Sequence, residues 1–123
     1  MSLPVPAQPA RVFAASLAVL DEQVVVVVPL APDADARPRE AIVLRDERGV
    51  LRAYRNLCQH LPVPLDAGSR RFIFSGYLLC GTHGARYRLA DGLCVHGPCL
   101  GKALRVLEIE CVGDQLFVLD AGQ

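Results

Sequence analysis

The sequence predicts an all-β fold with antiparallel strand pairing. Six short runs rich in β-branched and aromatic residues are bounded by turn residues, which is typical of strands. The turn-forming segments DERG (residues 46–49) and VGDQ (residues 112–115) separate neighbouring runs, where hairpin turns belong. No segment shows a helical apolar period over three turns. Neighbouring strands are therefore expected to pair antiparallel.

The expected elements follow in chain order. Residues 1–10 contain three prolines and no regular period, so we expect an extended arm, followed by one domain over residues 11–123. Residues 31–40 mix Pro, Asp and Ala and are expected to form a solvated loop. Along residues 103–112 the apolar positions change faces midway, which predicts a bulge or a change of sheet. The expected strands are residues 24–28, 41–46, 51–56, 71–80, 103–112 and 115–119.

Charge and hydropathy exclude two classes of partner. Thirteen basic and thirteen acidic residues cancel, so no long-range field favours nucleic acid. The longest uncharged stretches, residues 12–20 and 23–32, are shorter than the roughly 20 apolar residues that span a bilayer. The first only weakly resembles a signal peptide, because acidic residues follow it at once. We expect a cytoplasmic protein that binds neither nucleic acid nor membrane.

Two Cys/His motifs are the main chemical signal. The chain has five cysteines, an odd number, and no export signal, which argues against a disulfide framework. Cys58 and His60 are two positions apart, and in extended chain such residues face the same side. Cys80 and His83 are spaced so that a tight turn brings them together. Two thiolates and two imidazoles are the ligands of a binuclear iron–sulfur centre with cysteine on one iron and histidine on the other.

These motifs, C-x-H followed by C-x-x-H, resemble the ligand signature of Rieske [2Fe-2S] domains. Other positions match in order: Pro64-Leu65 and Gly68 after the first pair, then Gly84, Tyr87, Gly92 and the run Gly97-Pro98-Cys99, similar to the family's proline loop. The resemblance implies an antiparallel β-sandwich with a small cluster-binding subdomain inserted at about residues 56–100. It also implies a [2Fe-2S] cluster held by Cys58, His60, Cys80 and His83, with Leu61, Tyr87, Gly97 and Pro98 surrounding the ligands.

The chain departs from the family pattern at the rim of the expected cluster. The two motifs are separated by nineteen residues, 61–79, which implies a lengthened hairpin, and Pro62 replaces a glycine. Val63 and Thr82 stand where high-potential members carry an extra pair of cysteines, and Ala85 replaces their serine. Tyr87 keeps a hydroxyl that can donate to a ligand sulfur. We therefore expect a low to intermediate potential within the range of about −150 to +300 mV.

Two alternatives remain for the cysteines. Cys58 and Cys80 can be buried thiols, because free cysteine behaves as a small hydrophobe. Alternatively, a second C-x-H motif completes a tetrahedral zinc set of Cys80, His83, Cys94 and His96. Under the cluster interpretation, His96 is expected to be a surface residue and the other thiols packing residues, namely Cys94, Cys99 and Cys111.

The remaining residues favour an electron carrier over an enzyme. After His60 and His83 only His96 is left, too few histidines for the mononuclear iron of an oxygenase. No Gly-rich fingerprint for a nicotinamide or flavin nucleotide is present. The resemblance implies one-electron transfer, like that of Rieske ferredoxins, between a reductase and an oxygenase or other redox partner. The alternatives are a redox or iron sensor, a small subunit of a reductase complex, or a zinc-stabilised interaction module.

Overall fold

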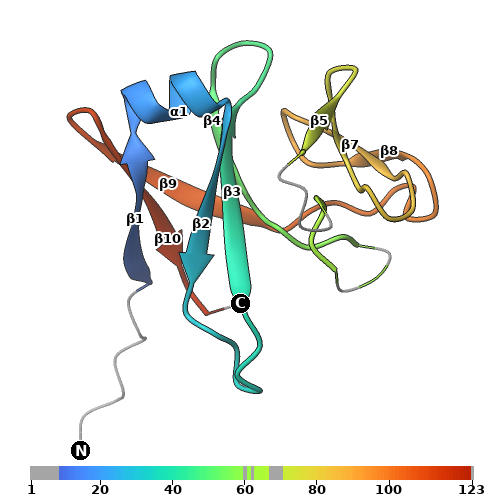
Figure 1. The fold of residues 1–123 in the computed structure, drawn as a ribbon, viewed down its shortest axis with the longest axis horizontal. Coiled ribbons are helices and arrows are strands. Elements are labelled where there is room, and N and C mark those ends of the chain that lie inside the picture. Colours follow the sequence, from blue (N-terminus) through green and yellow to red (C-terminus); the bar gives the residue numbers. More distant parts are fainter. Residues whose placement is uncertain (1–8, 60, 62, 67–70, 123) are drawn as a thin grey trace, which may run out of the picture.

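The computed structural model describes residues 9–59, 61, 63–66 and 71–122 (Figure 1). The expected arm falls largely on residues outside this set, as do His60 and Pro62. No described helix is long and apolar enough to cross a membrane.

A six-stranded antiparallel sheet forms the larger part of the molecule. Strand β9 (Val106–Val112) pairs first with β4 (Leu51–Arg55), through Leu107. From Glu108 onward it pairs with β10 (Gln115–Asp120), so it passes from one half of the sheet to the other. This change of partner coincides with the change of apolar faces that the sequence predicts. The strands lie in the order β1 (Ala10–Ser16), β10 (Gln115–Asp120), β9 (Val106–Val112), β4 (Leu51–Arg55), β3 (Arg39–Arg45) and β2 (Val25–Leu30).

The two halves of this sheet enclose a hydrophobic core. Its residues come from both halves, which confirms the predicted all-β sandwich. The core comprises Ala15, Leu20, Val26, Val28, Leu30, Ala41, Val43, Ala53, Leu116 and Val118.

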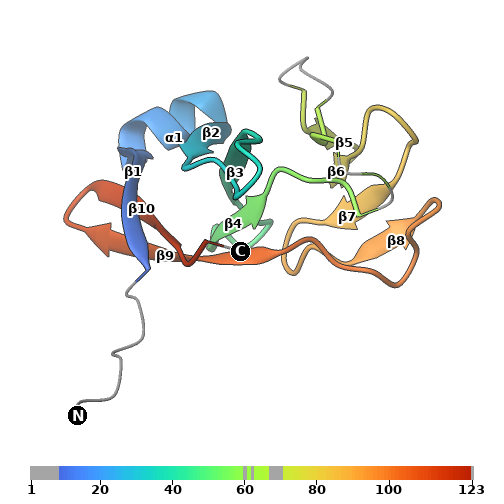
Figure 2. The same cartoon turned by 90° about the horizontal axis from the view of Figure 1, so that it is seen from below.

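A second, four-stranded sheet is inserted between β4 and β9. It lies to one side of the sandwich in both ribbon views (Figures 1 and 2). The predicted strand at residues 71–80 is a tight hairpin, β5 and β6, that turns at Ser75 and Gly76, both with positive φ. The sheet order is β5 (Ile73–Phe74), β6 (Tyr77–Leu79), β7 (Arg86–Arg88) and β8 (Cys94–His96).

Strand β3 has hydrophobic partners on both of its faces. Ala41 and Val43 belong to the core of the sandwich, whereas Ile42 and Leu44 belong to the core of the inserted subdomain. The neighbouring strand β2 divides its valines in the same way, so the run VVVVV needs no polar alternation. The subdomain is thus packed directly against the outer face of the sandwich.

The N-terminal apolar run forms two elements that the sequence did not reveal. Strand β1 is followed at once by helix α1 (Leu17–Gln23), whose first turn is capped by Ser16 as its hydroxyl accepts from the Val19 amide at 3.2 Å. A helix of two turns is too short to produce a recognisable apolar period. Only Ala15 of β1 is buried, so the strand also lacks a strong apolar alternation.

A buried ion pair connects β3 with β10. The Arg39 guanidinium donates to both carboxylate oxygens of Asp120, at 2.8 and 2.9 Å, and both side chains are about 4% exposed. This hydrogen bonding holds the pKa of Asp120 below its ordinary value. Strand β3 begins at Arg39 and not at residue 41, because Arg39 and Glu40 also pair with β2. The predicted loop is therefore shorter than expected.

Candidate metal centre

The loop after β4 carries the first cysteine, and local hydrogen bonds fix it. The Cys58 amide donates to the Val63 carbonyl at 2.8 Å, which folds the loop back on itself. At its base, the Asn56 side-chain oxygen accepts from the Leu65 amide at 2.8 Å. Cys58 is buried, whereas Leu61 at the loop's outer side is 42% exposed.

The loop after β6 carries the second motif in a tight turn, as the sequence predicts. The Cys80 amide donates to the Ala85 carbonyl and the Gly84 amide donates to the Cys80 carbonyl, each at 2.8 Å. Gly84 has a φ of 72°, which favours glycine. Cys80 is fully buried, while His83 lies exposed on the same turn.

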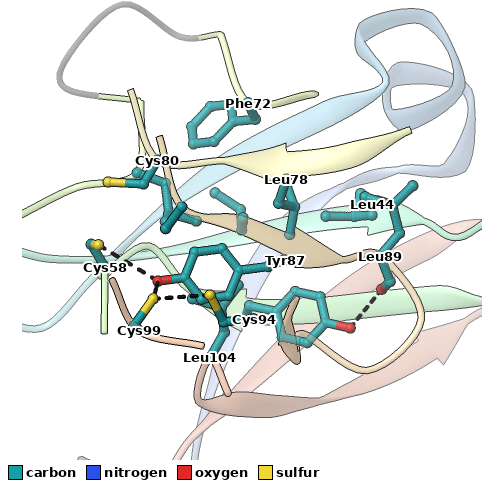
Figure 3. Close-up of a cluster of buried hydrophobic side chains, with 14 residues drawn as sticks. Leu44, Cys58, Phe72, Leu78, Cys80, Tyr87, Leu89, Cys94, Cys99 and Leu104 are labelled. Carbon is teal, nitrogen blue, oxygen red and sulfur yellow. Dashed lines mark hydrogen bonds between the residues drawn. The ribbon is translucent and has the colours of Figure 1, made fainter. Parts of the chain in front are cut away.

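The two loops meet at their cysteines. The Gly81 amide of the second loop donates to the Leu65 carbonyl of the first at 2.8 Å. Burial and a hydrogen bond with Cys58 raise the pKa of Cys80, while the backbone amides of His83 and Thr82 act in the opposite direction. In Figure 3 both sulfurs lie at the same end of the buried cluster. Two buried thiols are thus held together, and an exposed histidine lies on the second of the two loops.

The Tyr87 hydroxyl lies against one thiol of this pair, that of Cys58. It accepts the Gln59 amide proton at 3.0 Å and lies 3.5 Å from the Cys58 sulfur. A third neighbour is the Cys99 sulfur at 3.0 Å. Burial raises the pKa of Tyr87, so the phenol keeps its proton and has one hydrogen to donate. The Tyr87 hydroxyl is therefore placed to donate its proton to the Cys58 or the Cys99 sulfur.

The Gly97-Pro98-Cys99 loop packs on the second motif. Gly97 has a φ of 104°, and a Cβ at this position would lie 2.8 Å from the Cα of Ala85. Only glycine permits this approach. Pro98 and Leu100 are exposed on the outer side of the loop, while Cys99 is buried on its inner side.

The zinc alternative is wrong for the set that the sequence offered. Among the described residues, which include all four members of that set, no three metal-binding side chains converge on one ion. The Cys94 thiol instead donates to the His96 carbonyl at 3.3 Å. In a Rieske-type centre each iron takes only two ligands from the protein, so a single-ion group is not expected there.

The structure also shows which of the remaining cysteines are buried and where His96 lies. Cys94 and Cys99 are buried in the subdomain core, and His96 is exposed, as expected. Cys111 is exposed on β9, so the expected packing role is wrong for this residue. The contact of Cys99 with Tyr87 was not anticipated from the sequence; its one signal was the place of Cys99 directly after the Gly97-Pro98 pair.

Comparisons with known proteins agree on a family and a fold. The family model of the Rieske [2Fe-2S] domain matches residues 13–112. The ferredoxin of carbazole 1,9a-dioxygenase from Nocardioides aromaticivorans IC177 is 28% identical, with a TM-score of 0.61, over 93% of this chain and 99% of that one. No curated protein sequence matches the chain.

Two structures of lower sequence identity share the fold. One is a complex of reduced oxygenase and oxidised ferredoxin in carbazole 1,9a-dioxygenase, at 18% identity and a TM-score of 0.71, over 92% of this chain and 95% of that one. The other is the terminal oxygenase of carbazole 1,9a-dioxygenase from Novosphingobium sp. KA1, at 21% identity and a TM-score of 0.67. The match covers 94% of this chain but 31% of that oxygenase.

Proposed function

The chain belongs to the Rieske [2Fe-2S] domain family, binds a [2Fe-2S] cluster and transfers electrons, and we propose that it is a ferredoxin-like carrier between a reductase and an oxygenase or similar redox partner. The observation that carries this proposal is the end-to-end match with a ferredoxin, which covers 99% of that protein. The chain is an electron carrier and not an enzyme, in keeping with that match.

The proposed ligands are Cys58 and Cys80 on one iron and His60 and His83 on the other. Burial of the two thiols, their mutual hydrogen bond and the exposure of His83 support this set, and His60 lies outside the described residues. The bound cluster supplies a one-electron redox couple. The amides of Thr82 and His83 donate to the Cys80 sulfur and so stabilise negative charge on it.

The expected contacts of the redox partner are apolar. Leu61 and Leu100 are 42% and 68% exposed, and Pro98 is exposed in the loop that packs on the second motif. Exposed apolar side chains around a redox centre suit a transient partner, since they give short-range contact without strong charge pairing. One matched structure is a complex of an oxygenase with a ferredoxin, which supports a redox protein as the partner.

A reducing compartment fits the state of the cysteines. None of the five cysteines forms a disulfide, and four of them are buried. Several cysteines without a disulfide are typical of proteins kept in the cytoplasm. The cytoplasm is therefore the proposed location.

Metal analysis of the purified protein with matched variants tests the ligand set. Wild type is expected to be red-brown, with iron and acid-labile sulfide in equal amounts. Cys58→Ala and Cys80→Ala are expected to lose both, whereas Cys111→Ala, which removes an exposed thiol on β9, is expected to retain them. His83→Asn is expected to lose the cluster, and His96→Asn, at another exposed histidine, is expected to keep it. Zinc without sulfide in wild type would contradict the cluster.

Electron transfer is tested separately, in a reconstituted assay. A flavin-dependent ferredoxin reductase and a Rieske oxygenase are mixed with the holoprotein, and substrate oxidation is followed. The carrier role predicts turnover that depends on the holoprotein concentration. Failure to accept electrons from any reductase, with the cluster intact, would argue against the carrier role and for a sensor.

A further inference from the structure

Two buried thiols of the subdomain core take no part in the proposed ligand set. The sulfurs of Cys94, on β8, and Cys99, in the loop after it, lie 3.1 Å apart, and each side chain is about 1% exposed. Figure 3 shows them side by side below the ring of Tyr87. Both are free thiols.

The backbone holds these two residues on opposite arms of a closed loop. The Cys94 amide donates to the Lys102 carbonyl at 2.7 Å, and the Gly101 amide donates to the Cys94 carbonyl at 3.1 Å. On the other arm, the Lys102 amide donates to the Cys99 carbonyl at 2.9 Å. A disulfide has an S–S distance of about 2.05 Å, so the sulfurs need to approach by only about 1 Å. Little chain entropy is left to lose when such a loop is cross-linked.

We propose that Cys94 and Cys99 are a disulfide-forming site, closed by hydrogen peroxide and reopened by a dithiol reductant. In the forward reaction one sulfur attacks a peroxide oxygen, the O–O bond breaks, and a sulfenic acid and one water form. The second sulfur then attacks the sulfenic sulfur, and the S–S bond forms as a second water leaves. Two thiols lose two electrons and two protons, and one peroxide is reduced to two waters.

Burial determines which oxidant reaches the site and how fast it reacts. It raises the pKa of Cys94 to about 11, with a contribution from the neighbouring Cys99 thiol, so this thiol is protonated at neutral pH. Reaction is therefore slow, and the pair stays reduced under ordinary cytoplasmic conditions. A molecule as small as peroxide enters where a protein disulfide cannot. The exposed Cys111 has no such protection.

The site is connected to the metal centre by one side chain. The Tyr87 hydroxyl lies 3.0 Å from the Cys99 sulfur and 3.5 Å from the Cys58 sulfur. Closing the disulfide removes the Cys99 proton from this hydrogen-bonded set. The modification would thus act within two hydrogen bonds of a proposed ligand, without changing the ligands themselves.

Peptide mass mapping of the holoprotein tests the proposal. The protein is incubated with hydrogen peroxide, catalase removes the excess, and unfolding in iodoacetamide labels every free thiol. Trypsin cleaves after Arg88 and Lys102, so both cysteines lie in one peptide. We expect this peptide unlabelled and lighter by two hydrogens, and doubly labelled when dithiothreitol precedes the label. The same peptide doubly labelled after peroxide, or linked to the Cys58 or Cys80 peptide, would overturn the proposal.

Variants distinguish the specific linkage of Cys94 with Cys99 from nonspecific oxidation of other thiols. Cys111→Ser is expected to leave the linkage in peptide 89–102 unchanged, and Cys99→Ser is expected to abolish it. Linkage that persists between Cys94 and another cysteine in Cys99→Ser would overturn the specific pairing. Because the wild-type peptide map needs no variant, a folding failure of Cys99→Ser leaves the test intact. The map is read from mass alone, so its result is independent of whether the protein proves to be an electron carrier.

Discussion

The Tyr87 hydroxyl lies 3.5 Å from the Cys58 sulfur and has a single proton to donate. A hydrogen bond to a ligand sulfur stabilises the more negative, reduced cluster more than the oxidised one. Tyr87→Phe is therefore expected to lower the reduction potential. A differential of about 1 kcal/mol corresponds to roughly 40 mV for one electron.

Protein-film voltammetry measures this shift in potential. Tyr77→Phe is the matched control, since Tyr77 is half-buried on β6 at the hairpin end of the inserted sheet. Its potential is expected to equal that of wild type. An unchanged potential in Tyr87→Phe with the cluster intact would show that the hydroxyl does not donate to the ligand.

Gly97→Ala is expected to loosen the loop that covers the metal centre. The new Cβ would meet the Cα of Ala85 at 2.8 Å, and the backbone would also be strained at a φ of 104°. We expect the cluster to be lost at least several-fold faster, followed as the decay of visible absorbance. Gly101→Ala is the control, because Gly101 has a φ of 87° in the same loop but open space around it. Equal decay rates would mean that the close contact with Ala85 is unimportant.

Asp120→Asn is expected to destabilise the sandwich strongly. Removing one partner of a buried ion pair leaves the other charge uncompensated, at a cost of about 3–5 kcal/mol. Urea unfolding measures the loss. Asp21→Asn, which breaks the exposed pair of Asp21 with Arg45, is expected to change the free energy of unfolding by less than about 1 kcal/mol. Similar losses of stability in both variants would show that burial does not strengthen the contribution of the Arg39–Asp120 pair.

The buried pair of Arg39 and Asp120 also predicts how the free energy of unfolding depends on pH. The Arg39 guanidinium lowers the pKa of the Asp120 carboxyl in the folded protein, relative to about 3.9 in the unfolded chain. The stabilisation is fully present above the unfolded pKa and is lost as pH falls through the folded one. Urea unfolding at a series of pH values below about 4 should show wild type losing more stability than Asp120→Asn. Parallel pH profiles would assign the acid sensitivity to other carboxyls.

Tyr54→Phe is expected to weaken the attachment of the subdomain to the sandwich. The Tyr54 hydroxyl donates to the Leu89 carbonyl at 2.6 Å, and Gly92 packs against its ring, where a Cβ would lie 2.9 Å from a ring carbon. An unsatisfied buried carbonyl costs about 1–3 kcal/mol. Hydrogen exchange of the subdomain amides should accelerate, with little change in β1 and β10. Uniform acceleration throughout would indicate global destabilisation instead.

Much of the fold and of the site could be predicted from the sequence. Alternation and turn residues located every strand of the sandwich except β1, together with the hairpin at residues 112–115. The change of apolar faces in β9 predicted its change of partner. The spacing of Cys58 and Cys80 from their histidines was enough to expect two loops that meet. Features that depend on the residues of a single strand, turn or loop could therefore be predicted from local patterns.

Features that depend on distant partners could not be predicted. Arg39, expected in a solvated loop, is instead a strand residue that pairs with Leu30 and is buried against Asp120, 81 positions away. Strands β7 and β8 have three residues each, too few to show an alternation. The contact between Tyr87 and Cys99 likewise depends on how a loop folds over a strand, which no spacing in the sequence reveals.

Strand β3 limits how the metal-binding region can be transplanted. A graft cut at residues 56 and 100 would omit Ile42 and Leu44, whose side chains form part of that region's interior. Water would then reach the hydrophobic core of the subdomain, on which the two ligand loops rest. A minimal iron–sulfur module engineered from this protein must therefore carry the β3 surface with it, or supply an artificial replacement of equal shape.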